Sequence, residues 1–539
     1  MSKTEKSKFV FKKHDNIGAA DAEEDARFLE SCFIDTGDLT TLRDCSNPKR
    51  LVVGRTGSGK SALLMRLAEV EQRVIQVRPE SLALAYISNS TILQFLSELG
   101  VKLDIFFKLL WRHVFTVEIL KRHFKIDSEE SKQSFLDGLF NMFRDKKHVK
   151  ATEYLRKWGE SFWEETEYRI KEITQTLEQN LKTAVEADFS PAALSIEGAQ
   201  SLTESQKKDV IQRAQFVVNQ VQIRELSEIL DLLKDVLDDA QKRYFIVIDR
   251  LDDDWIEDRL RFRLIRALIE TIKDFSRVRN VKIVAAMRVD LLDRVFRLTR
   301  DAGFQEEKYE TLYLPIEWNK GQITRVLDAR IQALIRERYT KRPVFHPDIL
   351  PSSVDEKNAL DYMLERTMMR PRDLILFFNE CLEKAEGRAQ LTQQMIREAE
   401  AQYSHKRLRS LADEWVGDYP NLIFFSGLLR KRNRQFLLNS ITREEIGEFC
   451  LNFACSNFSG TDALSEAGDL FIDNQGRDDF LAVVFQVFHR IGIVGLKVRS
   501  YEPVMWVGAK RRTISRSEID HETRISIHPA YWRALGNQR

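Results

Sequence analysis

The part of the sequence best suited to chemistry is a glycine-rich segment, Gly54-Arg55-Thr56-Gly57-Ser58-Gly59-Lys60-Ser61. Its three glycines allow the backbone to curl so that successive N–H groups point inward at an anion. A helix that begins near Lys60 would add the positive end of its dipole. We therefore expect these eight residues to bind the phosphates of ATP, with Lys60 on the β- and γ-phosphates and Ser61 on Mg²⁺.

Acidic residues follow a second apolar segment. Asp249 closes the run 244–248, and Asp252 and Asp253 come shortly after it. A carboxylate at a strand end can hold Mg²⁺ through water, and a nearby acid can polarise the attacking water. We expect Asp249 to serve the metal and Asp252 or Asp253 to act as the general base, although the same residues also suit an acidic turn that caps the next helix. Many P-loop hydrolases place an acid directly after the metal-binding aspartate. This chain has Arg250 there, so we expect slow hydrolysis.

Two arginines could sense the nucleotide. Arg288 follows the apolar run 283–287 and should emerge at the same sheet edge as the glycine segment. Arg372 lies in the sequence Arg-Pro-Arg-Asp at 370–373, which opens a helix at Leu374–Ala385. We expect Arg288 to read the γ-phosphate and Arg372 to couple a helical lid to the nucleotide. The alternatives are a solvated arginine and an ordinary helix start.

Strands and helices must position these residues. Short, wholly apolar runs predict strands that are buried on both faces of a parallel sheet. The predicted strands are Leu51–Val53, Val74–Val77, Tyr244–Ile248, Lys282–Met287 and Thr311–Leu314, and the predicted helices among them are Asp21–Cys32, Ser61–Val70 and Trp255–Phe275. Alternating strands and helices indicate a doubly wound α/β fold, the P-loop NTPase parallel sheet.

The length of 539 residues predicts two to four domains. The middle of the chain is rich in Leu, Glu, Lys and Gln at helical spacing, with one long helix expected over much of Ser205–Ala240. The predicted segments are an N-terminal helix and lead-in at 1–47, the two parts of the sheet domain at 48–80 and 241–320, a helical insertion at 81–240, a helical lid at 321–405, and a winged-helix-like domain at 406–539.

Composition limits the class of protein. The net charge of +1 gives no global field toward nucleic acid or an anionic membrane. Five cysteines, odd in number and irregularly spaced, fit a reducing cytoplasm without disulfides. The most apolar long stretch, 101–120, carries several charges, so we expect a buried helix there, no membrane span and a cytoplasmic protein.

The C-terminal region predicts two helices and a hairpin. The helices are expected at Glu444–Phe453 and Phe480–Ile493, and the strands at Val494–Val498 and Pro503–Val507. This order fits a winged helix. The basic run Lys510-Arg511-Arg512 would then lie on or beside its wing, where it could contact DNA or RNA. A solvated hairpin or a protein-docking module fits the same pattern.

Four motifs resemble those of P-loop ATPases in the group that contains the STAND and KAP proteins, which are related to AAA+ proteins. They are GRTGSGKS at 54–61, FIVIDRLDDDW at 245–255, KIVAAMR at 282–288 and RPRD at 370–373. More closely, the chain resembles a set of poorly characterised bacterial ATPases that share an LPIEW-like segment, here at 314–318, and a tail like IHPAYWRAL at 527–535. Two features depart from the KAP pattern: Arg250 replaces the second acid, and the insertion lacks membrane spans.

The resemblance implies an ATP-hydrolysing molecular switch that forms a homo-oligomer. It also implies a protein partner or effector regulated by the switch, in bacterial antiviral (antiphage) defence or a stress response. An alternative function is a nucleic-acid-binding regulator that uses ATP as a structural ligand.

Overall fold

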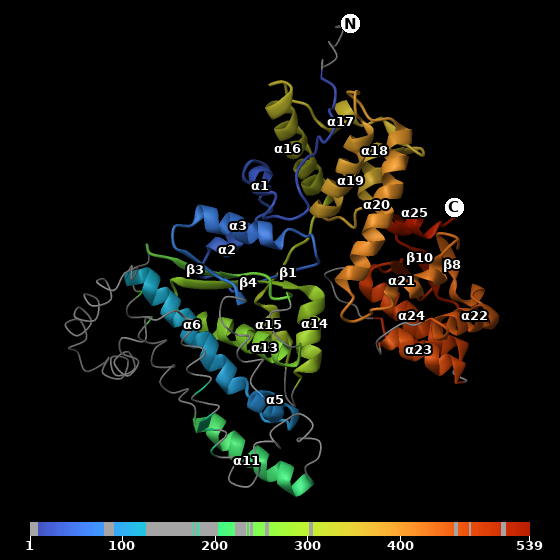
Figure 1. The fold of residues 1–539 in the computed structure, drawn as a ribbon. Coiled ribbons are helices and arrows are strands. Elements are labelled where there is room, and N and C mark those ends of the chain that lie inside the picture. The colour runs from blue at the N-terminus through green and yellow to red at the C-terminus, as the bar shows by residue number, and fades with distance from the viewer. Residues whose placement is uncertain are drawn as a thin grey trace. The chain divides into compact units, whose positions relative to one another are not determined.

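The chain forms two compact units in a computed structural model (Figure 1). The structure describes residues 9–79, 91–124, 175, 179–180, 183, 203–220, 233, 237, 241–253, 258–300, 305–456, 462–473, 476–507 and 514–538. The first unit, here called the sheet unit, comprises Asp35–Arg55 and Lys60–Ile316. The second, the helical unit, comprises Met1–Ile34, Thr56–Gly59 and Glu317–Arg539.

A five-stranded parallel sheet is the centre of the sheet unit. Its strand order is β2-β3-β4-β1-β5. The strands are β1 (Leu51–Gly54), β2 (Val74–Val77), β3 (Tyr244–Ile248), β4 (Val281–Arg288) and β5 (Tyr313–Pro315). All of β3 and seven of the eight residues of β4 are buried, as apolar runs in a covered parallel sheet require. The predicted P-loop NTPase-like α/β fold is confirmed.

Helices cover both faces of this sheet. Figure 1 shows α2 and α3 on one face and α6, α13 and α14 on the other. The helices of the unit are α2 (Asp38–Arg43), α3 (Lys60–Val70), α5 (Thr91–Glu98), α6 (Asp104–Phe124), α11 (Glu204–Gln220), α13 (Asp258–Phe275), α14 (Val289–Leu298) and α15 (Glu307–Glu310). The chain is thus doubly wound, as the alternation of elements predicts.

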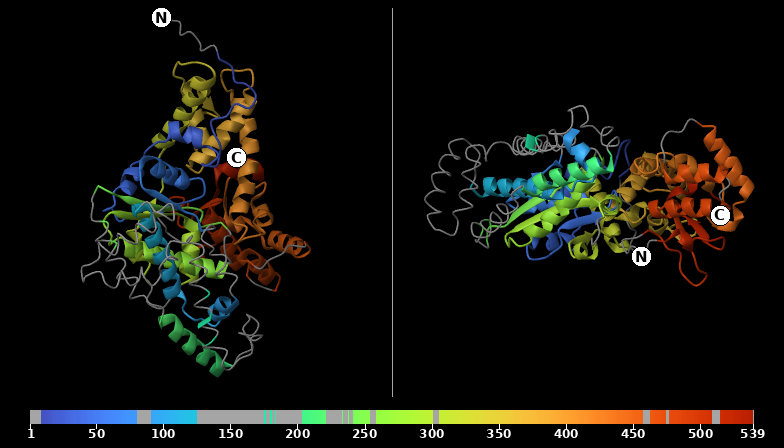
Figure 2. Two further views of the ribbon diagram at one scale, coloured as in Figure 1. Left: turned by 60° about the vertical axis from the view of Figure 1, so that its left-hand side comes forward. Right: turned by 90° about the horizontal axis from the view of Figure 1, so that it is seen from below.

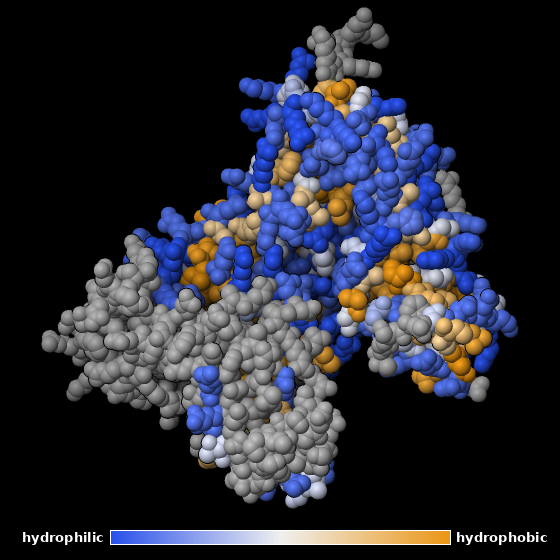
Figure 3. Space-filling model, viewed as in Figure 1, coloured by the Kyte–Doolittle hydropathy of each residue, from blue (hydrophilic) through white to orange (hydrophobic). Residues whose placement is uncertain are grey.

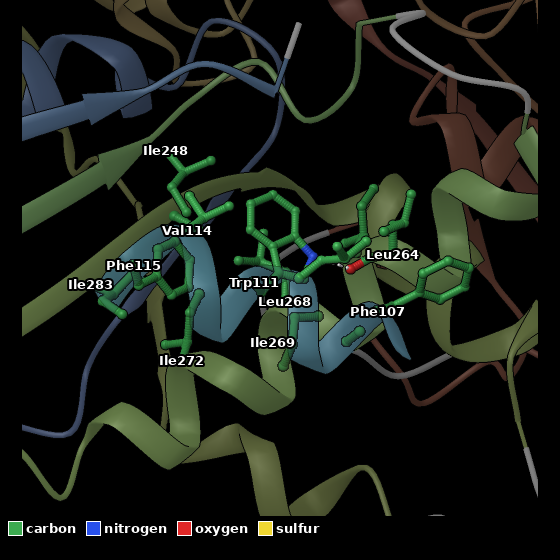
Figure 4. Packing of buried hydrophobic residues seen from close by; sticks show 14 of the residues in the cluster. Phe107, Trp111, Val114, Phe115, Ile248, Leu264, Leu268, Ile269, Ile272 and Ile283 are labelled. Carbon is green, nitrogen blue, oxygen red and sulfur yellow. Dashed lines mark hydrogen bonds between the residues drawn. The ribbon is translucent and has the colours of Figure 1, made fainter. Parts of the chain in front are cut away.

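Helix α6 contains most of the apolar stretch at 101–120 and is buried as predicted (Figure 4). Its Trp111 donates a 2.9 Å hydrogen bond from Nε1 to the Leu264 carbonyl of α13. Phe115 meets the edge of Phe275 at a centroid distance of 5.5 Å. Within the described ranges, every helix is too short or too polar to cross a membrane.

Most of the predicted insertion at 81–240 lies outside the described residues. Its described helices are α5, α6 and α11. The long helix expected over 205–240 corresponds to α11 as far as Gln220, and most of the remainder is not described. The start of the helix predicted at Trp255 is also outside, and α13 is described from Asp258.

The first part of the helical unit is a bundle here called the helical domain, residues 320–414. Its helices are α16 (Lys320–Arg338), α17 (His346–Ile349), α18 (Ala359–Leu364), α19 (Pro371–Lys384) and α20 (Gln393–Glu414), and a short hairpin joins β6 (Ser353–Val354) to β7 (Lys357–Asn358). The helix predicted at 374–385 corresponds to α19. Asn319 and Gln322 form a capping box that fixes the start of α16.

The N-terminal segment packs into the helical domain. Phe9, Phe11 and Ile17 belong to the same hydrophobic core as α16 and α19. Helix α1 covers Ala26–Cys32 and so begins five residues later than predicted. The reason is that Asp21 accepts a hydrogen bond from the Glu23 N–H and forms a turn instead.

A buried ion pair secures this segment. Asp25 pairs with Arg330 of α16, and their side chains are 4% and 6% exposed. Gly18 lies beside the pair with a φ of +117°, and a Cβ atom there would collide with the Arg330 guanidinium. Glycine at position 18 is therefore required both by the backbone conformation and by the ion pair.

The C-terminal domain, residues 415–538, follows α20 directly (Figure 2). A three-stranded antiparallel sheet has the order β8-β10-β9. The elements are α21 (Leu422–Phe425), η5 (Ser426–Leu429), β8 (Gln435–Leu437), η6 (Leu438–Ser440), α22 (Arg443–Ala454), α23 (Ala463–Ile472), α24 (Arg477–Ile491), β9 (Val494–Lys497), η7 (Arg516–Glu518), β10 (Arg524–Ile527), η8 (Pro529–Tyr531) and α25 (Trp532–Leu535).

The predicted C-terminal hairpin is confirmed only in part, because its second strand is reduced to one antiparallel bridge. Residues 503–507 form a single bridge, from Met505 to Leu496, whereas β9 pairs along its length with β10. Pro503 has no N–H to donate to a ladder, which weakens this segment as a strand. The two predicted helices correspond to α22 and α24, and Gly492 ends α24 in a left-handed conformation. The winged-helix assignment stays a prediction.

Exposed apolar side chains mark the surface of this domain (Figure 3). Leu451 of α22 is 58% exposed, and Leu470 and Ile472 of α23 are 53% and 42% exposed. Helix α24, the last helix before β9, has ten of its fifteen residues buried. These three exposed apolar side chains thus lie on α22 and α23, whereas α24 is largely buried.

Candidate nucleotide site

The glycine-rich segment forms the predicted loop between β1 and α3. Gly57 and Gly59 have φ values of +77° and +96°, which other residues rarely adopt. Within the described part of the chain, Thr56 Oγ1 and Ser58 Oγ are buried and have no hydrogen-bond partner. Lys60 Nζ donates to the carbonyls of Gly54 and Arg55 at 3.2 and 3.1 Å. Two free hydroxyls and a folded-back lysine in one loop fit a polyphosphate ligand.

Charged groups surround Lys60. Burial lowers the pKa of the Lys60 ammonium, and the carboxylates of Asp252 and Asp249 oppose that shift. Arg288 lowers the Lys60 pKa further and Asp290 raises it. The lysine, two aspartates and an arginine predicted for the site are therefore close enough to interact electrostatically.

The register of the parallel strands explains why these charged residues lie close together. Gly54 at the end of β1 is directly beside Arg288 at the end of β4. Asp249 follows Ile248, which ends β3 beside Ala285 of β4. The carboxyl ends of three neighbouring parallel strands thus deliver the loop, the arginine and the aspartate to one edge of the sheet.

A strained turn follows Asp249. Arg250 has a φ of +59°, an uncommon conformation for a residue with a side chain. Its N–H donates to Asp249 Oδ1 at 2.9 Å, and its carbonyl accepts the Asp253 N–H at 3.3 Å. This turn brings Asp252 to Arg288, with 3.6 Å between Oδ2 and Nη1, and within electrostatic range of Lys60. The general-base role of Asp252 or Asp253 stays a prediction.

Sequence reasoning missed Asp290. Its carboxylate accepts two hydrogen bonds from Arg288, at 3.0 Å from Nε and 2.7 Å from Nη2. The two side chains are 14% and 15% exposed. The available signal was an acid in the first turn of the helix that follows Arg288.

The predicted metal ligands are Ser61 and Asp249. Ser61 is the second residue of α3 and is half-buried, as is Asp249. Among the described residues there is no cluster of three or more His, Cys, Asp or Glu suited to a metal. This donor set fits Mg²⁺, which is commonly bound by one or two protein oxygens together with substrate phosphates and water.

Arg372 lies in the helical unit, beside the loop crest Thr56–Gly59 of the same unit. Its Nε donates to the Ala20 carbonyl at 2.8 Å, and its backbone N–H faces the Gly57 carbonyl at 3.4 Å. Two neighbours not predicted as site residues also contact the crest: Arg370 donates to the Thr56 carbonyl at 2.9 Å and Trp318 to the Ser58 carbonyl at 2.7 Å. The phosphate contact of Arg372 stays a prediction.

The basic run Lys510-Arg511-Arg512 lies outside the described residues. A second basic cluster, at 430–434, is partly used within the domain. Arg432 donates from Nε to the Leu428 carbonyl at 2.7 Å, and Arg434 stacks on Trp532 at 4.0 Å. Nucleic-acid contact therefore stays a prediction.

Two sequence comparisons find relatives of this chain. Residues 321–412, which cover α16 to most of α20, match the FunZ-associated C-terminal helical domain. The chain is 22% identical over 548 residues to the "Putative transposon gamma-delta 80.3 kDa protein" of Escherichia coli (strain K12), and the match covers 98% of this chain and 68% of that protein.

Two solved structures are similar over nearly the whole length. The Walker-type ATPase PABY2304 of Pyrococcus abyssi is 13% identical, with a TM-score of 0.34 and coverage of 97% of this chain and 98% of that one. The ORC2 protein of Aeropyrum pernix, solved in ADPNP and ADP complexes, is 12% identical, with a TM-score of 0.34 and coverage of 98% and 96%. Likenesses at this TM-score do not bear on function, which we infer from the site itself.

Proposed function

We propose that this protein is an ATPase that works as a nucleotide-driven molecular switch. The observation that carries the proposal is the convergence of Lys60, Asp249, Asp252 and Arg288 at the sheet edge where the glycine loop begins. A loop with left-handed glycines and free hydroxyls, followed directly by a partly buried lysine, suits a triphosphate.

Each residue has a role in the proposed reaction. The loop N–H groups and Lys60 bind the phosphates, and Ser61 and Asp249 hold Mg²⁺, which neutralises phosphate charge when bound. Asp252 orients the attacking water and accepts its proton, and Arg288 moves from Asp290 to the γ-phosphate. We infer slow turnover because Arg250 stands where many P-loop hydrolases have a second acid directly after the metal-binding aspartate.

We extend the proposal to a homo-oligomer that regulates a partner effector in bacterial antiphage defence or a stress response. The support is the resemblance of the motifs to STAND- and KAP-like ATPases. None of the described residues favours the alternative of a nucleic-acid-binding regulator.

The test uses purified full-length protein with MgATP. Wild-type protein should release phosphate slowly, and Asp249→Asn should bind nucleotide but lose Mg²⁺-dependent hydrolysis. Equal Mg²⁺-dependent hydrolysis by Asp249→Asn would remove the metal role from this residue, and no nucleotide binding by wild type would refute the proposed function. Particle mass with and without a non-hydrolysable ATP analogue tests oligomerisation.

Nucleic-acid binding is tested on the same preparation. If the alternative is correct, DNA or RNA binding should be sensitive to salt and lost when Lys510, Arg511 and Arg512 are replaced by alanine. If the protein shows no measurable binding of DNA or RNA, either with or without ATP, the alternative of a nucleic-acid-binding regulator is excluded.

A further inference from the structure

Three successive carbonyls of the loop crest are bound from outside the loop. Those of Thr56, Gly57 and Ser58 face Arg370 Nη1 at 2.9 Å, the Arg372 N–H at 3.4 Å and Trp318 Nε1 at 2.7 Å. All three donors belong to the helical unit, as does the crest. An isolated turn would leave these carbonyls to water.

The anchoring decides where the loop N–H groups point. Peptide planarity places the C=O of one residue opposite the N–H of the next. Donors that hold the Thr56 and Ser58 carbonyls outward therefore hold the N–H groups of Gly57 and Gly59 inward. A bound carbonyl also polarises its peptide and makes the N–H a better donor.

Close packing supports the same conclusion independently. A Cβ atom on Gly57 would lie 2.8 Å from Arg372 Cβ and 2.9 Å from its Cδ. A Cβ atom on Gly59 would lie 3.6 Å from the Trp318 ring. The loop backbone thus rests on the stem of Arg372 and near the indole, so that its position depends on theirs.

We propose that Trp318 and Arg370 are positioning residues that set the phosphate affinity of the loop through its outer carbonyls. This inference rests on the proposed function, because it assumes that the loop binds a nucleoside di- or triphosphate. It assigns these two side chains to the carbonyl side of the loop, so they act on the nucleotide without touching it.

Buried charged residues hold the Arg370 side chain in place. Asp373 lies between Arg370, 4.0 Å from its Nε, and Arg407 of α20, 3.6 Å from its Nε. These three residues are 1–4% exposed. Arg407 in turn pairs with Glu414 at 3.4 Å near the end of α20. A shift of α20 would therefore disturb Arg370 and change the nucleotide affinity of the loop. By linkage, nucleotide binding would then favour one position of α20, and the free energy of this preference equals the change in binding free energy that the shift causes.

A purely structural role makes a different prediction. If Trp318 and Arg370 only stabilise the helical unit, replacing them lowers the melting temperature and weakens the binding of all ligands to the same extent. If they position the loop, the loss is specific to phosphate. The ratio of the dissociation constants of ADP and adenosine separates these roles.

The experiment measures ADP and adenosine binding to the full-length protein by calorimetry. Trp318→Phe keeps an aromatic ring but removes the N–H donor, and Arg370→Gln removes the guanidinium. Trp532→Phe is the matched control, because its indole donates to the Ile527 carbonyl at 2.8 Å in the same unit. Melting temperatures without ligand report any general loss of stability.

We expect Trp318→Phe and Arg370→Gln each to bind ADP about fivefold more weakly, the size of one net hydrogen bond, with adenosine affinity within about twofold of wild type. Trp532→Phe should bind both ligands as wild type does. Unchanged ADP affinity, equal losses for ADP and adenosine, or failure of both variants to fold would overturn the inference. Wild-type protein that binds no ADP would refute the proposed function as well.

Discussion

The two ends of the central sheet both hold cations largely out of water, but they neutralise them differently. At the carboxyl end, Lys60 and Arg288 interact with the carboxylates of Asp252, Asp249 and Asp290. A phosphate can replace a carboxylate as the partner of an arginine or lysine at little electrostatic cost. Lys60 and Arg288 at the carboxyl end can therefore exchange their carboxylate partners for a bound phosphate.

The amino end holds Arg50, before β1, and Lys282, in β4. Lys282 Nζ donates to the carbonyls of Thr41 and Asp44 at 2.8 and 2.6 Å, near the end of α2. Arg50 donates to the carbonyls of Val281 and Cys45 at 3.3 and 3.4 Å. Backbone carbonyls cannot leave without unfolding the segment. A cation held out of water therefore indicates a ligand site only when its partners can be exchanged.

The largest expected effect is that of Lys60→Ala. The loop would lose its phosphate-binding ammonium, and we expect hydrolysis to fall by at least about 100-fold, as for removal of a key oxyanion donor. Phosphate release and nucleotide binding measure this loss. Lys282→Met is the matched control, a buried lysine at the other end of the sheet, and it should retain nucleotide binding. Normal turnover by Lys60→Ala would contradict the assignment of the site.

The next effect separates two neighbouring acids. Asp252→Asn should lower kcat by about 100-fold, because a general base contributes at least that factor, with little change in nucleotide affinity. Asp253→Asn should change kcat less than about threefold, because it is Asp252 that the turn brings to Arg288 and Lys60. Equal decreases of kcat in the two variants would contradict the assignment of Asp252 as the general base.

Lys282→Met should affect stability and spare function. It leaves the Thr41 and Asp44 carbonyls unpaired, which should cost about 1–2 kcal/mol of unfolding free energy. Urea denaturation measures this loss, and ADP affinity should stay close to that of wild type. If Lys282→Met instead weakened ADP binding while remaining as stable as wild type, the two ends of the sheet would not differ as described.

The same lysine predicts a dependence of stability on pH. Burial lowers the pKa of Lys282 from 10.5 to about 8. Between these values the unfolded chain binds more protons than the folded one, so stability rises with pH. The cost of burying the charged ammonium is fully present below the folded pKa of about 8 and is relieved as pH rises toward 10.5. The melting temperature of wild type should therefore rise relative to that of Lys282→Met across this window. Parallel profiles would contradict the shift.

The smallest effect is expected for Asp290→Asn. Removing the charge that holds Arg288 should free the guanidinium for phosphate and strengthen ATP binding by about threefold, the size of a partly exposed ion pair. Binding of a non-hydrolysable ATP analogue measures this gain. Asp293→Asn, on the same helix, is the control. Weaker binding by Asp290→Asn would mean that Asp290 orients Arg288 for the nucleotide instead of competing for it.

Local patterns predict much of this molecule. The apolar runs locate the five strands, and the glycine spacing locates the loop, because both depend on neighbouring residues. Asp249 and Arg288 could be placed at one edge because parallel strands end on the same side. Their individual roles still rest on the chemistry of the residues.

Contacts between distant parts of the chain could not be predicted in the same way. Strand β10 pairs with β8, although the described helices α22, α23 and α24 lie between them in the chain, and the sequence between them gives no sign of this partner. The bonds from Trp318 and Arg370 to loop carbonyls involve a backbone acceptor that every residue has, so no residue type indicates them. Asp290 has the pattern of an ordinary first-turn acid of a helix.

The docking of the N-terminal segment into the helical domain has a consequence for biosynthesis. Asp25 leaves the ribosome long before Arg330, and Ile17 donates its N–H at 2.9 Å to the side chain of Asn379, which is 362 residues later in the chain. Domains generally fold in order of synthesis, and long sequence separations slow closure. The sheet unit can therefore be complete while residues 9–34 still lack their partners, and the helical unit should be the last part of a nascent chain to become resistant to protease.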